Sequence, residues 1–335
     1  MTTIAVDAMG GDYAPGEIVH GAYLAANEVG VDIKLVGPEE LIKKELLKYP
    51  TRNTNIEIVH ADDVIDMAES QPASAVRKKA NSSIVVAMNQ VANGLASGVL
   101  AAGSTGAAAA AALFSLKRIE GIERPCIAAV LPTQKKPVIL VDAGANVEST
   151  SYQLLQNALM GYAFSKGLFK LENPRIGLLN IGEEPGKGNS LVKDTYQLLV
   201  NEKALNFIGN VEGRDIPEGI CDVCVCDGFV GNVFLKTAEG FAKMIAVLLR
   251  EELTRDTMSK LGALLAKDSF YRLRKRVDYS EYGGAQLLGV KGVCVIAHGN
   301  SRHIAIKNAI KVAKEASEAN IVNIIESMLK NYVKK

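Results

Sequence analysis

The fold is constrained most by one stretch, Val99–Phe114, which reads VLAAGSTGAAAAAALF. Its apolar start predicts a buried strand, its Gly103-Ser-Thr-Gly106 segment a tight turn, and its alanine run a helix that packs closely on the strand. The first N–H groups of such a helix have no partner within it and lie at the positive end of the helix dipole. Because glycine lets an anion come close to the backbone, we predict that this turn binds a phosphate or a carboxylate.

The same order of features recurs along the chain: an apolar strand, a loop rich in glycine and polar residues, and a helix. We expect about ten strands, mostly alternating with helices. Two of them, 127–131 and 138–141, are joined by a connection too short for a helical crossover, so this pair should be antiparallel. The pattern predicts a three-layer α/β/α sandwich around a mostly parallel, mixed sheet. Ligands bind beyond the carboxyl ends of such strands, so we expect one two-lobed domain over residues 1–335 whose loops converge on one sheet edge.

Residues 240–278 differ from this pattern and predict a helical hairpin that projects from the sheet. Apolar residues recur at helical spacing through 241–249 and again through 258–265, and a basic segment follows at 272–276. One interpretation of the hairpin is a dimer interface or a packed arm. The other is a basic amphipathic tip that lies on an anionic membrane surface.

The composition argues against several classes of function. The net charge is +1, aromatic residues make up 5% of the chain and tryptophan is absent, which disfavours nucleic-acid binding. No apolar run reaches the roughly 20 residues of a membrane span, and the N-terminus has no signal-peptide pattern, so we expect a cytoplasmic protein. Cys221 and Cys224 form a C-x-x-C pair in a strand-like run. That spacing would put the two thiols on opposite faces, so we expect buried core thiols and no metal site.

General nucleotide-binding and hydrolase motifs are missing from the sequence. The loop at 182–188 lacks the Walker spacing, and there is no dinucleotide fingerprint, Gly-x-Ser-x-Gly elbow or His-Glu-x-x-His motif. What remains is three loops that pair glycines with a following helix, at 103–106, 186–189 and 228–232. Any one of them could be an ordinary tight turn. Three that converge on one sheet edge predict a site that handles phosphate.

Charged residues fall at the same strand ends. Lys187 lies between two glycines, so it is either a cation that reaches an anion or a solvated loop lysine. His60 and His298 end strands, as ligand-facing groups or as hydrogen-bonded spacers, whereas we interpret His20 and His303 as isolated. Four loop aspartates could bind a cation, but we favour helix capping and loop fixing for them. These are Asp7, Asp12, Asp142 and Asp227.

Seven short motifs occur in order over nearly the whole chain. They are Ile4-Ala-Val-Asp-Ala-Met-Gly-Gly-Asp12, Gly103-Ser-Thr-Gly106, Asp142-Ala-Gly-Ala-Asn146, Asn180-Ile-Gly-Glu-Glu184, Asp227-Gly-Phe-Val-Gly-Asn232, Tyr282-Gly-Gly284 and His298-Gly299. In these motifs the chain resembles the bacterial phosphate acyltransferases of phospholipid synthesis, and the first motif is specific to that family. Ser104 and Val230 stand where Asn and Thr are common in the family, and Tyr13 stands where His is common.

The resemblance implies a fold like that of the isocitrate and isopropylmalate dehydrogenases and the phosphotransacetylases. It implies that an acyl-[acyl carrier protein] reacts with inorganic phosphate, without a cofactor, to give an acyl phosphate that feeds a membrane glycerol-phosphate acyltransferase. Family members are homodimers that contact the membrane through the projecting hairpin, here through Leu261, Leu264 and Leu265. Two other interpretations stay open: a phosphotransacetylase-like enzyme that uses acyl-coenzyme A, and a non-catalytic sensor of phospho-ligands or acyl groups. The missing dinucleotide fingerprint disfavours a dehydrogenase.

The expected chemistry needs no protein nucleophile. The second pKa of a phosphoester is about 6, so phosphate near pH 7 is largely dianionic, and a thiolate with a pKa of roughly 8.5 leaves readily. The protein must hold phosphate beside the carbonyl and stabilise an oxyanion.

The expected catalytic groups are Lys187, Asn189, Asn232 and His298. The expected phosphate-binding or substrate-binding residues are Asp7, Gly10, Gly11, Gly103, Ser104, Thr105, Gly106, Asn146, Gly186, Gly188, Asp227, Gly228 and Gly231. We expect two basic clusters to bind the acidic acyl carrier protein, although such clusters can also be ordinary solvent-exposed surface. Their residues are Arg77, Lys78, Lys79, Arg272, Arg274, Lys275 and Arg276.

Overall fold

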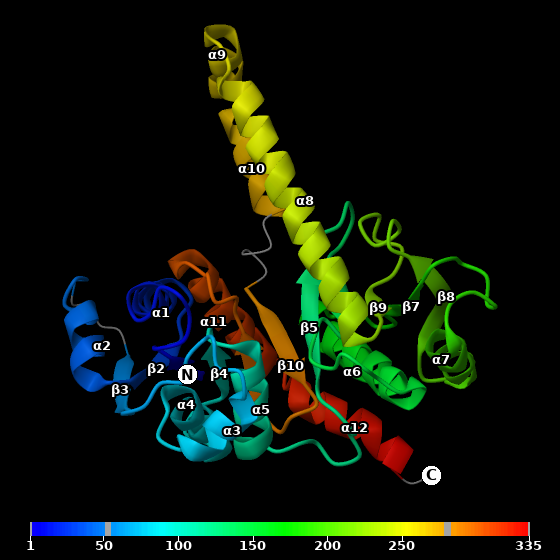
Figure 1. Cartoon of the computed structure of the whole chain (residues 1–335), viewed down its shortest axis with the longest axis horizontal. Coiled ribbons are helices and arrows are strands. Elements are labelled where there is room, and N and C mark those ends of the chain that lie inside the picture. Colours follow the sequence, from blue (N-terminus) through cyan, green and yellow to red (C-terminus); the bar gives the residue numbers. More distant parts are fainter. Residues whose placement is uncertain (1, 51–54, 278–282, 334–335) are drawn as a thin grey trace.

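The computed structural model describes residues 2–50, 55–277 and 283–333, without the side chains of residues 274, 275, 277 and 331–333. Across these residues a single mixed sheet of 11 strands forms the centre of the protein (Figure 1). The strand order is β3-β2-β1-β4-β11-β10-β5-β6-β9-β7-β8. The strands are β1 (Thr3–Asp7), β2 (Asp32–Gly37), β3 (Ile56–His60), β4 (Gly98–Ala101), β5 (Cys126–Leu131), β6 (Val138–Val141), β7 (Arg175–Asn180), β8 (Asn206–Glu212), β9 (Val223–Val225), β10 (Ala285–Leu288) and β11 (Val293–Ile296).

The sheet has two halves that run in opposite directions. Strands β1 to β4 and β11 are parallel to one another, and β5 runs the same way because β10 lies antiparallel between β11 and β5. Strand β6 is antiparallel to β5, which confirms the prediction for that pair, and β9, β7 and β8 run parallel to β6. The carboxyl ends of β1, β4 and β11 therefore lie at one edge of the sheet. Those of β6, β7 and β9 lie at the opposite edge.

Helices cover both faces of the sheet and produce the predicted three-layer sandwich. One face packs against α1, α2, α6, α7, α11 and α12 through a core that includes Ile18, Leu154 and Ile310. The other packs against α3, α4, α5 and the first part of α8, and here Ala111 of the alanine helix is fully buried. The helices are α1 (Gly16–Glu28), α2 (Glu39–Leu46), α3 (Pro72–Lys78), α4 (Ser83–Ala92), α5 (Thr105–Ser115), α6 (Ser151–Phe169), α7 (Ser190–Asn201), α8 (Gly228–Thr254), α9 (Thr257–Leu265), α10 (Lys267–Val277), α11 (His303–Glu318) and α12 (Ile321–Val333).

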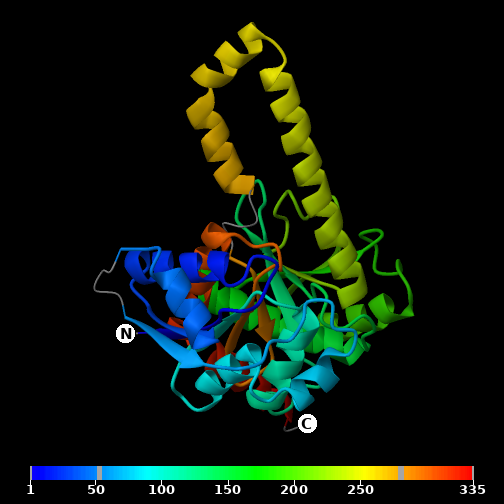
Figure 2. The same cartoon turned by 60° about the vertical axis from the view of Figure 1, so that its left-hand side comes forward.

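Helices α8, α9 and α10 form an arm that stands away from the rest of the protein (Figures 1 and 2). Helix α8 begins at Gly228, well before the start at residue 240 that the sequence suggests, and its 27 residues give a length of about 40 Å. Its outer half carries apolar side chains between Phe241 and Leu249 that are 39–60% exposed. On the return, Arg276 of α10 donates a hydrogen bond to the Gln134 carbonyl between β5 and β6. Within the described residues, every helix is too short or too polar to cross a bilayer.

The five cysteines are free and buried, which confirms that they are core thiols. The expectation that Cys221 and Cys224 lie on opposite faces is wrong, because Cys221 precedes β9 and is not part of the strand. The two thiols share a hydrogen bond, which together with burial raises the pKa of Cys224 well above its usual value. With its raised pKa, the Cys224 thiol holds little thiolate, the form that reacts in disulfide exchange or binds a metal.

Candidate active site

The three glycine-rich loops start from two different sheet edges, so the expectation of one shared edge is wrong. Two of them, the 103–106 turn and the 228–232 loop, nevertheless line the same cavity through Thr105 and Asn232. The turn at 103–106 follows β4, whereas the loops at 186–189 and 228–232 follow β7 and β9. Three antiparallel pairings, β11 with β10, β10 with β5 and β5 with β6, separate β4 from these two strands, so their carboxyl ends point in opposite directions. Helix α8 connects the two groups of loops, because it starts at the second edge and brings Glu239 to His298 at the first.

The loops that follow β1, β4 and β11 pack closely on one another. The N–H of Asp12 donates to the Gly299 carbonyl at 2.8 Å. A Cβ atom on Gly10 would lie 2.7 Å from the nitrogen of Gly103, and one on Gly11, whose φ is +98°, would lie 2.9 Å from the Gly299 oxygen. Gly10 and Gly11 therefore support the 103–106 turn from behind, because no larger residue fits there.

Asp7 lies beneath the same turn and is 4% exposed. Its carboxylate accepts a hydrogen bond from the N–H of Met9 at 3.2 Å. Burial raises the pKa of Asp7 to about 6, although hydrogen bonds from Ser83, Met9 and Gly10 act in the opposite direction. Asp7 thus fixes the loop after β1, as the sequence analysis favours for the loop aspartates.

Helix α5 begins at the 103–106 turn with its first N–H groups open. Ser104 is the N-cap residue, but its side chain makes no capping hydrogen bond. By contrast, Asn189 caps α7 by accepting the N–H of Val192 at 3.0 Å, and Asp227 caps α8 in the same way. Among the three glycine-rich loops, the one at 103–106 therefore leaves its helix start available to an anion.

A cavity of about 270 Å³, which we call the polar pocket, opens at the start of α5. Its walls come from α5, β5, β10, β11, α8 and the loop that follows β6. The polar side chains that line it are Thr105, Asn232, Lys236, Glu239 and His298. The pocket thus combines a helix N-terminus with a lysine, a histidine and an amide.

Glu239 holds the two basic side chains of the polar pocket in place. Its carboxylate lies 2.9 Å from Lys236 Nζ and 3.1 Å from His298 Nε2. Burial opposes ionisation of Glu239, but the contacts with His298 and Lys236 outweigh it and hold its pKa below the usual value. The carboxylate is therefore ionised at neutral pH and orients both partners.

Sequence reasoning missed Lys236 and Glu239. Together with Asn232 they occupy positions i, i+4 and i+7, which is one face of α8. The spacing places the three residues on one face only if residues 228–239 form a helix. Because the Gly228-Phe-Val-Gly231 start resembles a loop, the sequence does not indicate that helix.

The two strand-end histidines have different surroundings. His298 lines the polar pocket beside Glu239. His60 lies 2.8 Å from Asp62, and its Nδ1 accepts the N–H of Glu39 at 3.4 Å. His60 therefore acts as the hydrogen-bonded spacer that was one of its two interpretations.

A second cavity, of about 610 Å³, lies on the other side of α8, and we call it the apolar pocket. Its lining comes from α6, β7, α7 and α8 and is mostly aliphatic or aromatic, with Val192, Phe229, Val233 and Phe234 among the side chains. Helix α8 is a shared wall, since side chains on its two flanks face different pockets.

The predicted residues of the 186–189 loop lie at the second sheet edge. Lys187 is exposed, donates its N–H to the Glu184 carbonyl and lines neither of the two pockets. Gly188 and Asn189 line the apolar pocket, and a Cβ atom on Gly186 would meet only open space. The fold therefore separates Lys187 from the 103–106 turn, and Lys236 is the lysine that shares a pocket with that turn.

Gly228 and Gly231 face the 142–146 loop and allow close packing there. A Cβ atom on Gly231 would lie 1.9 Å from the Asp142 carbonyl oxygen, and one on Gly228 would lie 2.5 Å from the Asn146 oxygen. The Asn146 amide donates to the Asp142 carboxylate at 2.9 Å and to the Pro125 carbonyl at 2.8 Å. These residues hold the first turn of α8 against the sheet.

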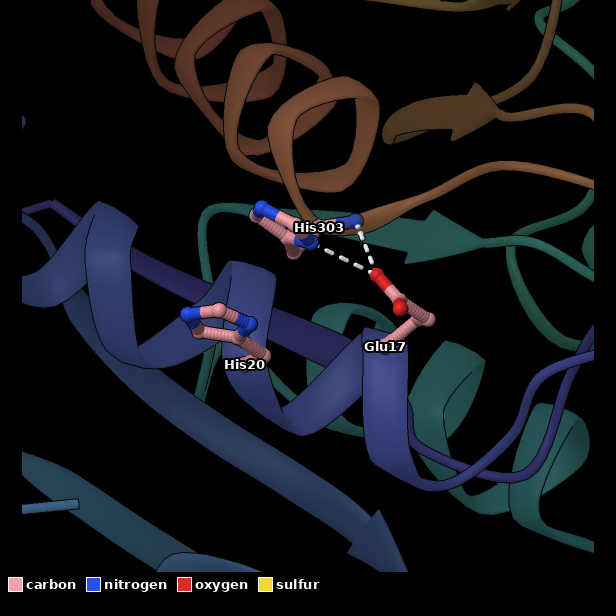
Figure 3. Close-up of side chains that lie close together, drawn as sticks. All are labelled: Glu17, His20 and His303. Atoms are coloured by element: carbon pink, nitrogen blue, oxygen red, sulfur yellow. Dashed lines mark hydrogen bonds and ion pairs between the residues drawn. The ribbon is translucent and has the colours of Figure 1, made fainter. Parts of the chain in front are cut away.

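The interpretation of His20 and His303 as isolated is wrong, as Figure 3 shows. Their rings stack with centroids 4.2 Å apart, and Glu17 Oε2 lies 2.7 Å from both the backbone nitrogen and Nδ1 of His303. Burial opposes ionisation of Glu17, but hydrogen bonds from His303 keep its pKa low. The donor atoms of the three residues lie within 4.8 Å of one another, so this cluster has the composition of a metal site. It joins α1 to α11, and no local sequence signal brings those helices together.

The basic residues expected at 77–79 surround the end of α3. The Arg77 guanidinium lies 4.8 Å from the centre of the Phe114 ring on α5. Lys79 donates to the Val64 carbonyl at 2.8 Å, and Lys78 is exposed. Part of this basic group is thus engaged within the protein.

The second basic group lies on α10 of the arm. Arg272 donates to the Ser269 hydroxyl at 3.0 Å, and Arg276 contacts the β5–β6 loop. The side chains of Arg274 and Lys275, and all of Tyr282, lie outside the described part of the chain.

The three leucines expected at the membrane lie on α9, at the tip of the arm (Figure 2). Leu261, Leu264 and Leu265 are 52%, 67% and 82% exposed. Nothing in the described protein covers them.

Comparison with known proteins gives consistent results. A family model described as a fatty acid synthesis protein matches residues 2–324. The phosphate acyltransferase of Pelotomaculum thermopropionicum is 50% identical over 328 residues, which cover 98% of this chain and 95% of that one. The phosphate acyltransferase of Desulforamulus reducens is 51% identical over 333 residues, 99% and 98% of the two chains.

Solved structures with low sequence identity share the fold. A phosphotransacetylase from Streptococcus pyogenes aligns with a TM-score of 0.63 and 15% identity over 95% of this chain and 94% of its own. The EutD phosphotransacetylase from Staphylococcus aureus aligns with a TM-score of 0.58 and 16% identity over 94% of each chain. Because about half of its residues are identical to those of the two phosphate acyltransferases over nearly its full length, the chain belongs to the phosphate acyltransferase family.

Proposed function

We propose that this protein transfers a fatty acyl group from an acyl-[acyl carrier protein] to inorganic phosphate, and that the acyl phosphate serves glycerol-phosphate acylation in phospholipid synthesis. The observation that carries the proposal is the open start of α5, which faces a pocket that also holds Lys236 and His298. Backbone N–H groups at a helix N-terminus and a lysine are the groups that bind phosphate in proteins.

The arrangement suits phosphate as the attacking species. The first N–H groups of α5 and the Lys236 ammonium hold the dianion, and Asn232 and His298 donate hydrogen bonds to the developing oxyanion. A phosphate oxygen bonds to the thioester carbonyl carbon, and collapse of the tetrahedral intermediate breaks the C–S bond. The electron pair leaves with the carrier thiolate, which water protonates. Lys187 and Asn189, at the opposite sheet edge, take no part in this arrangement.

The surface residues suggest three partners for the protein. The basic residues around α3 and on α10 would attract the acidic carrier protein. The apolar stripe of α8 would pack against a second copy of this chain. The exposed leucines of α9 would enter a membrane surface next to the acyltransferase that consumes the product.

The test is a coupled measurement of thioester loss and acyl phosphate formation with a long-chain acyl-[acyl carrier protein], with and without phosphate. We expect both to require phosphate and to occur in equal amounts. The same assay with acyl-coenzyme A separates a carrier-protein enzyme from a coenzyme A enzyme. Thioester loss without phosphate, or a covalent acyl-protein that accumulates during turnover, would rule the mechanism out.

A further inference from the structure

The polar pocket cannot hold a fatty chain. Its volume is about 270 Å³ and five of its lining side chains are polar or charged. Each methylene group that is buried in a protein strengthens binding roughly fourfold. A hydrocarbon chain that stays in water gains none of this affinity. An enzyme with a long-chain substrate therefore needs a second, apolar compartment next to its polar one.

The apolar pocket has the size and the lining for such a chain. Its volume of about 610 Å³ lies within the range of about 300–1,000 Å³ that is typical of ligand sites. Aliphatic and aromatic side chains from four elements form most of its surface. They include Leu154 of α6, Leu178 of β7, Val192 of α7, and Val230 and Val233 of α8. Lys187, which is adjacent in sequence to the lining residue Gly188, does not line it.

Residues in the first turns of α8 line both pockets. Phe229 lines the apolar pocket and Asn232 lines the polar one. Residues three apart on a helix have Cβ atoms about 5–6 Å apart, so one side chain separates the compartments. Phe229 is 60% exposed, which leaves the route over this turn open.

We propose that the apolar pocket binds the hydrocarbon chain of the acyl substrate, which leaves the reacting carbonyl beside Asn232 and enters past Phe229. The inference rests on the proposed function, because it places the tail of the same substrate. It makes α8 the partition between the reacting end and the chain. The pocket depth along α8 then limits the chain length that the protein accepts.

The test replaces Val233, which is 52% exposed and so tolerates change, by a larger side chain. Val233→Trp should lower kcat/KM for a 16-carbon acyl-[acyl carrier protein] at least about tenfold and leave a 4-carbon substrate within about twofold. The matched control is Val200→Trp on α7, at a side chain that is 54% exposed and outside the pocket. The control should behave as the parent with both substrates. Equal effects of Val233→Trp on both chain lengths, or no effect on either, would overturn the inference.

A binding measurement separates this inference from the proposed reaction. The chain has no tryptophan, so Phe229→Trp introduces a single fluorescent reporter. Without phosphate, a non-hydrolysable 16-carbon acyl thioester analogue should shift its emission to shorter wavelength, and a 4-carbon analogue should not. A shift without any phosphate-dependent turnover would support the chain site and refute the reaction. Turnover of long chains without a shift would support the reaction and refute the chain site.

Discussion

At the scale of single residues, Glu239 is the group that organises the polar pocket. It is ionised, mostly buried and within 3.1 Å of both Lys236 and His298. A lysine on a flexible stem loses side-chain entropy when it binds an anion, and a fixed carboxylate neighbour reduces that loss. The strand-to-helix turn at 103–106 could be predicted from the sequence, because its glycine content and its position between an apolar strand and an alanine-rich helix are local signals. Lys236 and Glu239 could not, since their role depends on where α8 crosses the sheet.

The first prediction compares two lysines. Lys236→Ala should lower kcat about 10²-fold or more, because it removes a charge that faces the phosphate. Lys187→Ala should change kcat less than about threefold, because Lys187 is exposed at the opposite sheet edge. Steady-state phosphate-dependent acyl transfer measures both, with circular dichroism as the check on folding. A large loss in Lys187→Ala with normal activity in Lys236→Ala would return the cation to the 186–189 loop.

The second prediction concerns Asp7, whose pKa is raised from 3.8 to about 6 by burial. Between these values the folded protein keeps a proton that the unfolded chain has lost, so stability falls as pH rises through this window. A shift of about two units corresponds to about 3 kcal/mol at neutral pH. Asp7→Asn should therefore raise the free energy of unfolding at pH 7.5 by about 1–3 kcal/mol and flatten its pH dependence between pH 4 and 6. Urea denaturation at pH 4.5 and 7.5 tests this, and equal changes at both would contradict it.

At the scale of elements, α8 is the helix with the most varied surroundings. Its first turn packs on the 142–146 loop through glycines, its next two turns separate the pockets, and its outer half is exposed. The sequence predicts apolar periodicity in the outer half but not the continuation back to Gly228, because Gly-Phe-Val-Gly resembles a loop. The short strand β10 is missed for a related reason, since four residues give too little alternation to detect.

The third prediction concerns α9 at the tip of the arm. Leu264→Glu should weaken binding to vesicles that contain anionic lipid about tenfold or more, because it replaces an inserted side chain by a charge that the membrane repels. Co-sedimentation with vesicles measures the effect. Leu47→Glu, at a side chain that is 85% exposed on the body, is the matched control and should bind as the parent does. Unchanged binding of Leu264→Glu would show that the tip does not enter the lipid.

At the scale of the whole molecule, the reversal of strand direction between β5 and β6 decides at which sheet edge each glycine-rich loop begins. Local patterns identify the antiparallel pair at 127–131 and 138–141, and the structure confirms it. They do not reveal that every later strand of that half follows the reversed direction, because strand order is set by packing between distant segments. For this reason the sequence locates the glycine-rich loops but groups all three together. In the fold, the 186–189 loop lines a different cavity from the one that the 103–106 turn shares with Asn232.

The fourth prediction concerns assembly. The apolar stripe of α8 between Phe241 and Leu249 is too extensive for a monomer in water, so the protein should sediment as a dimer of 35.7 kDa chains. The double variant Ile245→Glu and Leu248→Glu should shift the mass to that of one chain. Leu41→Glu, on an exposed side chain of α2, should leave the mass unchanged. Light scattering after size exclusion distinguishes the two masses, and a dimeric double variant would place the interface elsewhere.

The continuity of α8 has a mechanical consequence. One uninterrupted helix of 27 residues carries Lys236 in the polar pocket and extends to Thr254 near the tip of the arm, and the stretch between these two residues is about 27 Å long. The same helix therefore links an end that is packed tightly on the 142–146 loop to an end that is free of the protein body (Figure 1), so a force on the arm would be carried to the wall of the polar pocket.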